Sequence, residues 1–386
     1  MNHDLRPGSQ TALRIANRDR LIAQLRAKPA SQADLARATG LAPATISSLV
    51  RELQRTGVLG VDEGSGRRLI RLLPRRGLVA SIDYGHGHVS VAIADDEPCL
   101  RAERRLRLEP GIEAVEGLAV ANRLLELALS DADLTLDDLV GVGMGLPAPI
   151  DHGTGKVGSP SILPGWRGLR AAQLATEAVG RPVVIDNDAN LGALAEFRWG
   201  HGRRGDIQNL AFLKLSDGVG AGLIIDGALY AGPDGTAGEI GHTTVEEYGS
   251  ICRCGNRGCL ETLVSTGAVL ETLRPVVDVR GELTISEVVR RAGDGDRACS
   301  RVLQDVGTQV GRSIADLCNL LNLQTIVIGG ELAQAGGILL DAIGQVVERY
   351  GIPSAVQRVR IVVSDLGAHA PLLGGIALAF DAVEPR

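Results

Sequence analysis

The segment CRCGNRGCLE, Cys252 to Glu261, holds three cysteines within eight residues, and His242 lies ten residues before the first of them. One imidazole and three thiolates make a full tetrahedral ligand set for Zn²⁺; here they come from His242, Cys252, Cys254 and Cys259. A zinc ion with four protein ligands keeps no open position for a substrate. The sequence therefore predicts a structural zinc site in a loop over residues 242–261.

Two other interpretations of these cysteines stay open, namely a cluster of reduced thiols and a disulfide. A bridge between Cys252 and Cys254 is geometrically poor, because only Arg253 separates them and a disulfide needs a narrow range of Cα separation. Gly255 and Gly258 favour the metal, because glycine tolerates positive φ and lets the backbone turn tightly round an ion.

Carboxylates and an amide accompany the metal loop. Glu239 and Glu261 each lie within three residues of a metal ligand, and the run DNDAN at residues 186–190 ends an apolar stretch. A rigid loop that holds two carboxylates beside Asn187 and Asp188 can hydrogen-bond several hydroxyl groups at once, which suits a sugar. The alternative is that these groups only cap and solvate loops near a structural metal.

The long C-terminal part alternates apolar strands and Gly-rich turns with helical stretches such as VEGLAVANRLLELALS at 115–130. This alternation predicts an α/β fold with its functional groups at the turns. Two turns, one after Asp83 and the other in SDGVGAG at 216–222, are compatible with an anion. Each turn alone is a weak signal, because any α/β fold needs glycine in tight turns.

Charge divides the 386 residues into two parts. Residues 1–76 hold 14 Lys and Arg against 6 Asp and Glu, a net charge of +8, whereas residues 77–386 hold 26 against 40, a net charge of −14. Such asymmetry is typical of a nucleic-acid-binding module attached to another domain.

No apolar run approaches the ~20 residues of a membrane helix, and the N-terminus lacks the core of a signal peptide. We therefore expect a cytoplasmic protein without membrane contact, as three scattered lone thiols also suggest: Cys99, Cys299 and Cys318.

The basic part predicts a winged helix-turn-helix in a domain of residues 1–75. Ser31 suits the N-cap of the second of three helices and Gly40 suits its end, and the third helix carries an apolar stripe over 46–53. The start of such a helix meets base edges, and arginines of the following hairpin grip phosphates or enter the minor groove. The expected DNA contacts are Pro43, Ala44, Thr45, Ser47, Ser48, Arg51, Arg67 and Arg68. The alternative is a protein-interaction module with a solvated basic face.

Taken together, these motifs resemble those of the ROK family, which comprises sugar-responsive repressors, open reading frames and sugar kinases. The match covers nearly the whole chain and rests on the zinc-ligand spacing, GVGMGLPAPID at 141–151, LPGW at 163–166, DNDAN and AGEIGH at 237–242. The resemblance implies a two-lobed actin-like ATPase fold over residues 76–386, with a sugar between the lobes. It implies that Asp188 matches the general base of the kinases and that the sugar-binding positions are Asn187, Asp188, Glu239, His242 and Glu261.

Departures from the kinase pattern fall where ATP would sit. Where the kinases resemble D-x-G-G-T, this chain has DYGHGH at 83–88, with His86 for the second glycine and Gly87 for the threonine. Where the kinases have G-T-G, this chain has SDG at 216–218, which directs an aspartate toward phosphate. Like charges in a confined site are costly, so we expect no catalytic residue and no enzymatic activity.

Three functions follow as hypotheses. The first, which we favour, is a sugar-responsive transcriptional repressor that binds palindromic operator DNA as a homodimer or tetramer, and a sugar or sugar phosphate in the cleft. The second is an active ATP-dependent sugar kinase, which the intact Asp188 favours and the altered phosphate turns oppose. The third is a zinc-stabilised interaction protein with no small ligand.

Overall fold

The computed structural model describes residues 17–18, 20–25, 28–55, 58–62, 68–72, 77–95, 100–109, 111–158, 163–278 and 281–383. The chain divides into two compact units, one of residues 1–77 with 380–386 and one of residues 78–379. Within the described ranges, no helix combines the length and the apolar character that crossing a membrane requires.

The N-terminal unit is a set of short helices followed by a β-hairpin. Residues 17–18 and 20–25 are helical, and the Ser31 hydroxyl accepts a hydrogen bond from the Asp34 amide at the start of the next helix. Gly40 ends that helix with φ of 70°. The elements are α2 (Gln32–Thr39), α3 (Pro43–Arg55), β1 (Leu59–Asp62) and β2 (Leu69–Leu72), with the two strands antiparallel. This is the helix order and hairpin that the sequence predicts.

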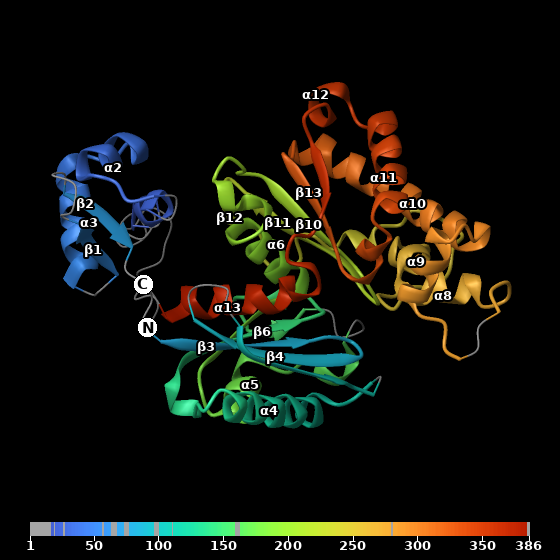
Figure 1. The fold of residues 1–386 in the computed structure, drawn as a ribbon, viewed down its shortest axis with the longest axis horizontal. Helices are drawn as coiled ribbons and strands as arrows, with labels where there is room; N and C mark the ends of the chain where they lie inside the picture. Colours follow the sequence, from blue (N-terminus) through green and yellow to red (C-terminus); the bar gives the residue numbers. More distant parts are fainter. Residues whose placement is uncertain are drawn as a thin grey trace. The chain divides into compact units, whose positions relative to one another are not determined.

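The first lobe of the larger unit is a five-stranded sheet between helices. Its strand order is β5-β4-β3-β6-β9, with β4 antiparallel to both neighbours and the last three strands parallel. Helices α4 and α5 cover one face, and α13 lies on the other (Figure 1). The bounds are β3 (Leu78–Tyr84), β4 (His88–Ala94), β5 (Leu100–Arg107), β6 (Leu139–Leu146), β9 (Val183–Asn187), α4 (Ala114–Asp131), α5 (Ala171–Val179) and α13 (Ala370–Val383).

The second lobe repeats this topology. Its order is β12-β11-β10-β13-β14, again with one strand antiparallel to both neighbours and three parallel strands. The repeated sheet gives the two-lobed actin-like fold that the family resemblance implies. The bounds are β10 (Leu210–Leu215), β11 (Val219–Ile225), β12 (Ala228–Leu229), β13 (Thr325–Gly329), β14 (Arg360–Val363), α6 (Asp188–Arg198), α8 (Thr266–Leu273), α9 (Ile285–Gly293), α10 (Arg297–Leu321) and α11 (Gly337–Tyr350).

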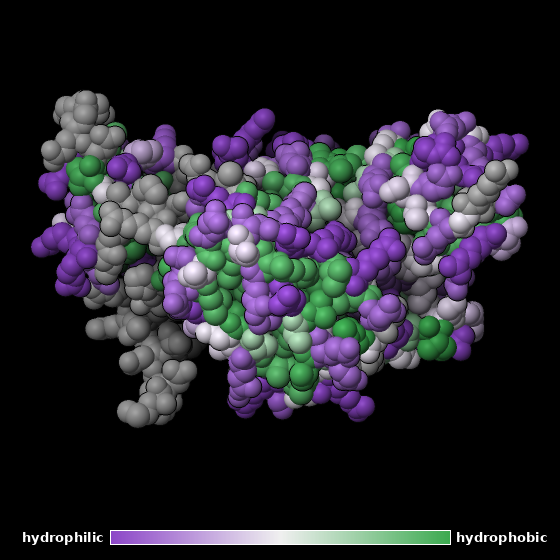
Figure 2. Space-filling model, turned by 60° about the horizontal axis from the view of Figure 1, so that its bottom comes forward, coloured by the Kyte–Doolittle hydropathy of each residue, from purple (hydrophilic) through white to green (hydrophobic). Residues whose placement is uncertain are grey.

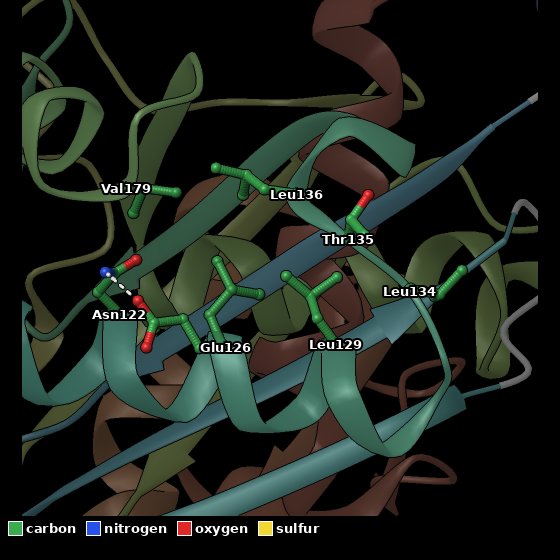
Figure 3. A pocket seen from close by; sticks show the side chains of 8 residues that line it. Asn122, Glu126, Leu129, Leu134, Thr135, Leu136 and Val179 are labelled. Atoms are coloured by element: carbon green, nitrogen blue, oxygen red, sulfur yellow. Dashed lines mark hydrogen bonds between the residues drawn. The ribbon is translucent and has the colours of Figure 1, made fainter.

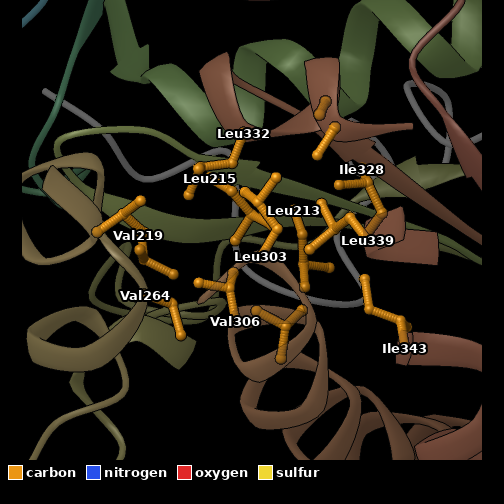
Figure 4. Close-up of a cluster of buried hydrophobic side chains, with 14 of the residues drawn as sticks. Leu213, Leu215, Val219, Val264, Leu303, Val306, Ile328, Leu332, Leu339 and Ile343 are labelled. Atoms are coloured by element: carbon orange, nitrogen blue, oxygen red, sulfur yellow. The ribbon is translucent and has the colours of Figure 1, made fainter. Parts of the chain in front are cut away.

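The largest buried cluster lies between the second sheet and its helices (Figure 4). Strand side chains that alternate toward one face meet the inner faces of α10 and α11, as the period of two in strands and of 3.6 in helices requires. Burial of these aliphatic groups anchors the strands whose ends form the cleft. The cluster includes Leu213, Leu215, Ile328, Leu303, Val306, Leu339 and Ile343.

Glycines bring the two helices that connect the lobes close to the backbone. α6 runs from β9 of the first sheet toward the second, and α13 returns after β14 to the first. A Cβ on Gly143 would lie 2.0 Å from the carbonyl oxygen of Gly375, and one on Gly374 would lie 2.0 Å from that of Leu191. α13 therefore contacts both β6 and α6 through backbone atoms, at positions where no larger residue fits.

Substitution of Gly143 by alanine tests this close approach. Gly143→Ala forces the Gly375 carbonyl to move, and overpacking of this kind lowers the free energy of unfolding by about 1–3 kcal/mol. Gly344→Ala is the matched control, because its Cβ would meet open space within α11 and alanine is the better helix former by up to ~1 kcal/mol. Denaturant titration measures both values; an unchanged midpoint for Gly143→Ala would contradict the packing argument.

Candidate functional site

The four predicted zinc ligands converge in the second lobe. Their ligand atoms all lie within 4.8 Å of one another. The Cys254 Sγ to Cys259 Sγ distance is 3.6 Å and the Cys252 Sγ to His242 Nδ1 distance is 3.5 Å. A tetrahedron built on Zn–S bonds of ~2.3 Å has S–S edges of about 3.8 Å. The donor set and its spacing therefore fit a structural Zn²⁺.

The loop backbone holds the cluster in shape. Isolated bridges pair Thr244 with Cys259 and Ile251 with Arg257, and the Cys252 amide donates to the Asn256 carbonyl at 2.8 Å. A Cβ on Gly258 would lie 1.6 Å from the Glu246 carbonyl oxygen, so this turn requires glycine at a φ of 64°. The metal-binding loop is thus tightly folded, and glycine is required at residue 258.

Burial favours the protonated form of two thiols in the cluster. Desolvation raises the pKa of Cys259 to about 12, with the neighbouring thiols acting in the same direction. Desolvation also raises the pKa of Cys252. Zinc binds thiolates, so metal binding must release these protons, and the site would lose affinity as the pH falls.

His242 joins the metal cluster to the cleft. Its Nδ1 faces Cys252, while its Nε2 lies 3.6 Å from the Glu239 carboxylate. A metal on Nδ1 would leave the proton on Nε2, where it points to Glu239 or to a ligand. Burial, followed by the negative charges of Asp188 and Glu261, raises the pKa of Glu239 to about 7. Near neutral pH this carboxyl group can therefore both donate and accept hydrogen bonds.

The end of β9 supplies the amide and carboxylate on the first-lobe side. The Asn187 side chain accepts from the Ala189 and Asn190 amides as the N-cap of α6. Asp186 accepts from the Asn187 amide at 2.7 Å and from the Asn190 side chain at 2.8 Å. Asp186 is therefore occupied with local structure, whereas Asn187 and Asp188 line the cleft.

Lys214 lies opposite Asp188 and was not singled out by the sequence analysis. Its ammonium is 2.5 Å from the Asp188 carboxylate, and the two side chains are only 16% and 7% exposed. Burial alone would lower the pKa of Lys214, but the charges of Asp188 and Asp83 raise it overall. Burial raises the pKa of Asp188 and the nearby Asp83 charge acts in the same direction, against the ion pair with Lys214. The ammonium is thus held charged between two carboxylates.

Glu261 and Arg253 complete the site. Glu261 accepts from the Val219 amide at 3.0 Å and pairs with the Arg253 Nε at 2.9 Å. Arg253 lies in the zinc loop between two cysteines, and its guanidinium also reaches the Asp217 carbonyl oxygen at 3.0 Å. Like Lys214, it is a cation that we did not anticipate among the cleft residues.

One cavity brings the predicted sugar positions together. Its volume is about 40 Å³, which is room for only a few water molecules at ~10–15 Å³ for each. The first lobe supplies one wall and the second lobe the other. The lining residues are His86, Pro147, Ala148, Asn187, Asp188, Lys214, Gly218, Val219, Gly220, Glu239, His242 and Glu261.

A larger hollow of about 330 Å³ lies elsewhere on the first lobe (Figure 3). It opens on the face that carries α4, where apolar side chains gather (Figure 2). We do not assign the site to it, because aliphatic side chains form most of its wall and Glu126, its one carboxylate, is hydrogen-bonded to Asn122. The lining residues are Asn122, Leu125, Glu126, Leu129, Leu134, Thr135, Leu136 and Val179.

Most of the predicted DNA contacts lie on α3 of the N-terminal unit. The apolar stripe of α3 is buried, while Pro43, Ala44, Ser48 and Arg51 are exposed and Thr45 and Ser47 are half-buried. The Arg51 Nε donates to the Ser47 carbonyl at 3.3 Å and remains at the surface. Arg68, just before β2, is exposed. Arg67 lies outside the described residues, as does Cys99.

Comparisons with known proteins point to one family. The ROK family profile matches residues 79–382. The xylose repressor of Caldicellulosiruptor bescii is 29% identical over 90% of this chain and 91% of its own length. A ROK family transcriptional regulator, a homologue of Escherichia coli Mlc, superposes with a TM-score of 0.80 at 26% identity over 96% of both chains. A ROK family glucokinase from Streptomyces griseus, solved with glucose and AMPPNP, has a TM-score of 0.71 at 25% identity over 79% of this chain and all of its own.

Loss of one ligand tests the metal cluster. We expect about one zinc per purified chain, and we expect Cys254→Ser to remove most of it and to lower the unfolding temperature, because three ligands bind zinc far more weakly than four. Cys299→Ala, which changes a lone buried thiol of α10, is the control and should retain zinc. Metal analysis decides; equal zinc in wild type and Cys254→Ser would exclude this cluster as the site.

Proposed function

This chain belongs to the ROK family, and we propose that it is a sugar-responsive transcriptional repressor. In this proposal residues 1–75 form a winged helix-turn-helix that binds operator DNA, and residues 76–386 bind a sugar or sugar phosphate. One observation supports this proposal above all. The same chain contains a basic helix-and-hairpin unit and a cleft, and the cleft is lined by all five positions that the family resemblance gives as sugar-binding. The name of the C. bescii relative combines the same two properties, a sugar and repression.

The DNA half of the proposal rests on α3. The buried apolar stripe occupies one face of this helix, so only the opposite face can contact DNA. Small side chains at its start allow close approach to the bases, and Arg51 is long enough to reach a guanine or a phosphate. The arginines at 67 and 68 in the hairpin would hold the phosphate backbone.

The sugar half rests on the chemistry of the cleft. Asp188, Glu239 and Glu261 offer carboxylate oxygens, while Asn187 and His242 offer N–H donors from opposite walls. Hydroxyl groups both donate and accept, so a sugar can satisfy all of them at once. The S. griseus glucokinase, a structural relative, was solved with glucose. The zinc loop would fix His242 and Glu261 relative to each other, because His242 is a predicted ligand and Glu261 follows the ligand Cys259 by two residues.

The alternative, an active sugar kinase, is disfavoured by charge. Lys214 engages the carboxylate of Asp188, so the matching kinase base is already paired. The Asp217 side chain accepts a hydrogen bond from Thr266 and fills the second phosphate turn with an acidic residue. Phosphoryl transfer depends on stabilising negative charge in that place. We therefore propose a regulator without kinase activity, in which the cleft serves binding alone.

A repressor of this kind would act as a two-fold assembly. Paired DNA-binding units match palindromic half-sites at whole helical turns, so we propose a homodimer that could associate further into a tetramer. The sugar can change operator affinity only if it binds two conformations of the protein unequally.

Arg51 tests the DNA interface. Using double-stranded DNA selected in vitro by the wild-type protein, we expect Arg51→Ala to weaken binding about tenfold or more, since such a contact contributes ~1–3 kcal/mol. Arg301→Ala removes the same charge from an exposed position on α10 and should leave binding unchanged. Electrophoretic mobility shift titration at fixed salt gives both constants. Equal loss in the two variants would mean a non-specific charge effect.

Thermal unfolding against free hexoses, pentoses, amino sugars and their 6-phosphates, with and without Mg-ATP, tests the cleft. One sugar should raise the midpoint and ATP should add nothing. At pH 8, above the pKa of about 7, Glu239 is ionised, so Glu239→Gln should weaken that sugar about tenfold or more, because hydrogen bonds to charged groups contribute ~1.5–3 kcal/mol.

Glu246→Gln is the matched control for the sugar experiment. It alters a carboxylate of the same metal loop that is exposed and does not line the cavity. A further shift with ATP, or turnover of ATP, would restore the kinase alternative, and no shift with any sugar would remove the sugar hypothesis.

A further inference from the structure

Carboxylate groups outnumber cationic groups around the cleft in the described part of the chain. The cavity lining contains three carboxylates and one lysine. Two further carboxylates act on that lysine through their charge, and one arginine is paired with a lining carboxylate. The carboxylates are Asp83, Asp188, Asp217, Glu239 and Glu261, and the cations are Lys214 and Arg253. A ligand of the cleft therefore meets acidic surroundings.

Each of the two cations is already paired with a carboxylate. The Lys214 ammonium lies 2.5 Å from the Asp188 carboxylate, and the Arg253 Nε lies 2.9 Å from the Glu261 carboxylate. The Arg253 Nη2 also donates to the Asp217 carbonyl oxygen at 3.0 Å. Buried charges of opposite sign that lie this close balance each other. An anionic ligand would therefore meet cations whose charge the protein has already neutralised.

Asp83 adds a second negative charge near Lys214. Its carboxylate is buried; one oxygen lies 3.1 Å from the His88 Nε2, and the other finds no hydrogen-bond donor among the described residues. Burial acts to raise the pKa of Asp83, but the hydrogen bond with His88 and the charge of Lys214 lower it overall. Asp83 is therefore ionised at neutral pH. Its charge and that of Asp188 raise the pKa of Lys214 in spite of burial.

The two histidines that line the cavity add no positive charge. Burial, followed by the charges of Arg253 and Lys214, lowers the pKa of His86 to about 4, so this ring is neutral at neutral pH. His242 belongs to the proposed zinc cluster, and a histidine binds zinc as a neutral imidazole. Three thiolates carry more negative charge than Zn²⁺ carries positive charge, so the occupied cluster would not attract an anion either.

Hydroxyl groups suit this lining better than a phosphate group does. Ionised carboxylates only accept hydrogen bonds, so they require donors from a ligand. A sugar hydroxyl can donate, whereas a phosphate ester at neutral pH carries about two negative charges and offers acceptors almost exclusively. Like charges held close together in a confined site are unfavourable. The donors and the charges of the lining thus both favour an uncharged ligand.

We infer that the effector is a sugar without a phosphate or carboxylate group, and that Asp83 contributes to this selection through Lys214. The inference rests on the proposed function and names the chemical class of its ligand. Asp188, Glu239 and Glu261 would receive hydroxyl donors directly. Asp83 does not line the cavity; it is a positioning residue that keeps the charge of Lys214 balanced. A sugar phosphate is then excluded by charge even where its ring fits.

Ligands that differ in charge test the selection. Calorimetry compares glucose with glucose 6-phosphate, glucuronate and 6-O-methylglucose, and the same four forms of any other hexose that stabilises the protein; a pentose is compared with its 1-phosphate. The phosphate ester and the uronate should bind about a hundredfold more weakly than the free sugar, because unfavourable charge contacts of this kind are costly. The uronate is little larger than the hexose, and the methyl ether is larger but uncharged, so the series separates charge from size.

Two results of this series would overturn the inference. One is a phosphate ester or uronate that binds as tightly as the free sugar or more tightly, which would leave the proposed function intact. The other is a methyl ether that is rejected as strongly as the phosphate ester, because size would then explain the selection. Absence of binding by any form of any sugar would instead contradict the proposed function itself.

Neutralisation of Asp83 tests the same idea from the side of the protein. Asp83→Asn keeps the size of the side chain and its position beside His88 but removes one negative charge near Lys214. The ratio of free-sugar affinity to phosphate-ester affinity should fall about tenfold, and the free-sugar affinity should change far less than this ratio. A merely structural role would weaken both ligands alike, and an unchanged ratio would contradict the role of Asp83.

Two further variants support this comparison. Asp217→Asn removes an exposed carboxylate that also acts on Lys214, so it should lower the ratio in the same direction and supplies the test if Asp83→Asn fails to fold. Asp341→Asn removes an exposed carboxylate of α11 and should leave the ratio at the wild-type value.

Inorganic phosphate provides a readout that needs no sugar. Millimolar phosphate should shift the unfolding midpoint equally in the wild type and in Arg253→Gln, because the cleft has no unbalanced cation to offer it. Stabilisation by phosphate that is present in the wild type and lost in Arg253→Gln would place an anion beside the cleft and would overturn the inference.

Discussion

The rest of the cleft depends on the buried ion pair between Lys214 and Asp188. Acidic side chains converge between the lobes, and charges taken out of water are costly unless they are paired. Lys214 comes from a strand of the second sheet and Asp188 from the first turn of α6, directly after a strand of the first sheet. The ammonium opposes the rise that burial causes in the pKa of Asp188, and it joins the ends of the two sheets. Without it, only the charge of Asp83 and burial would act on Asp188, and both raise its pKa.

Two internal cations, Lys214 and Arg253, are paired with carboxylates that line the cleft. A kinase brings in positive charge with its metal–nucleotide complex and leaves its base free to take a proton from the sugar. Here Lys214 and Arg253 already supply positive charge beside Asp188 and Glu261. The cleft can still recognise hydroxyl groups, because hydrogen bonds require only correctly placed donors and acceptors. In the proposed regulator, binding and catalysis would thus separate through a few charged side chains while the scaffold stays the same.

Local patterns in the sequence predicted most of the fold and a coherent set of cleft residues. The spacing of cysteines and glycines, the Ser31 cap and the strand-turn alternation are short-range signals, and the two-lobed fold with its helix-and-hairpin unit is confirmed. Lys214 and Arg253 were missed because their roles depend on partners in the other lobe. In the sequence, Lys214 is one charge within an apolar strand and Arg253 is a residue between two cysteines. Asn187 performs the capping role that was weighed as an alternative, because its side-chain oxygen caps α6, and it also lines the cavity.

In the proposed function, a metal-binding loop beside the cleft would fix the side chains that meet a sugar. A flexible loop could carry Glu261 into the cleft, but its side chains would lose much conformational entropy on each binding event. A loop fixed by four ligands bears that cost once, on folding, and then moves as one body. Any shift of Glu261 toward a sugar must then be shared by Arg253, only one residue from two ligands of the cluster. The same guanidinium reaches His86, so the loop also contacts the first-lobe side of the cleft. A rigid loop would therefore fix Glu261 and Arg253 relative to each other and to their contacts on both sides of the cleft.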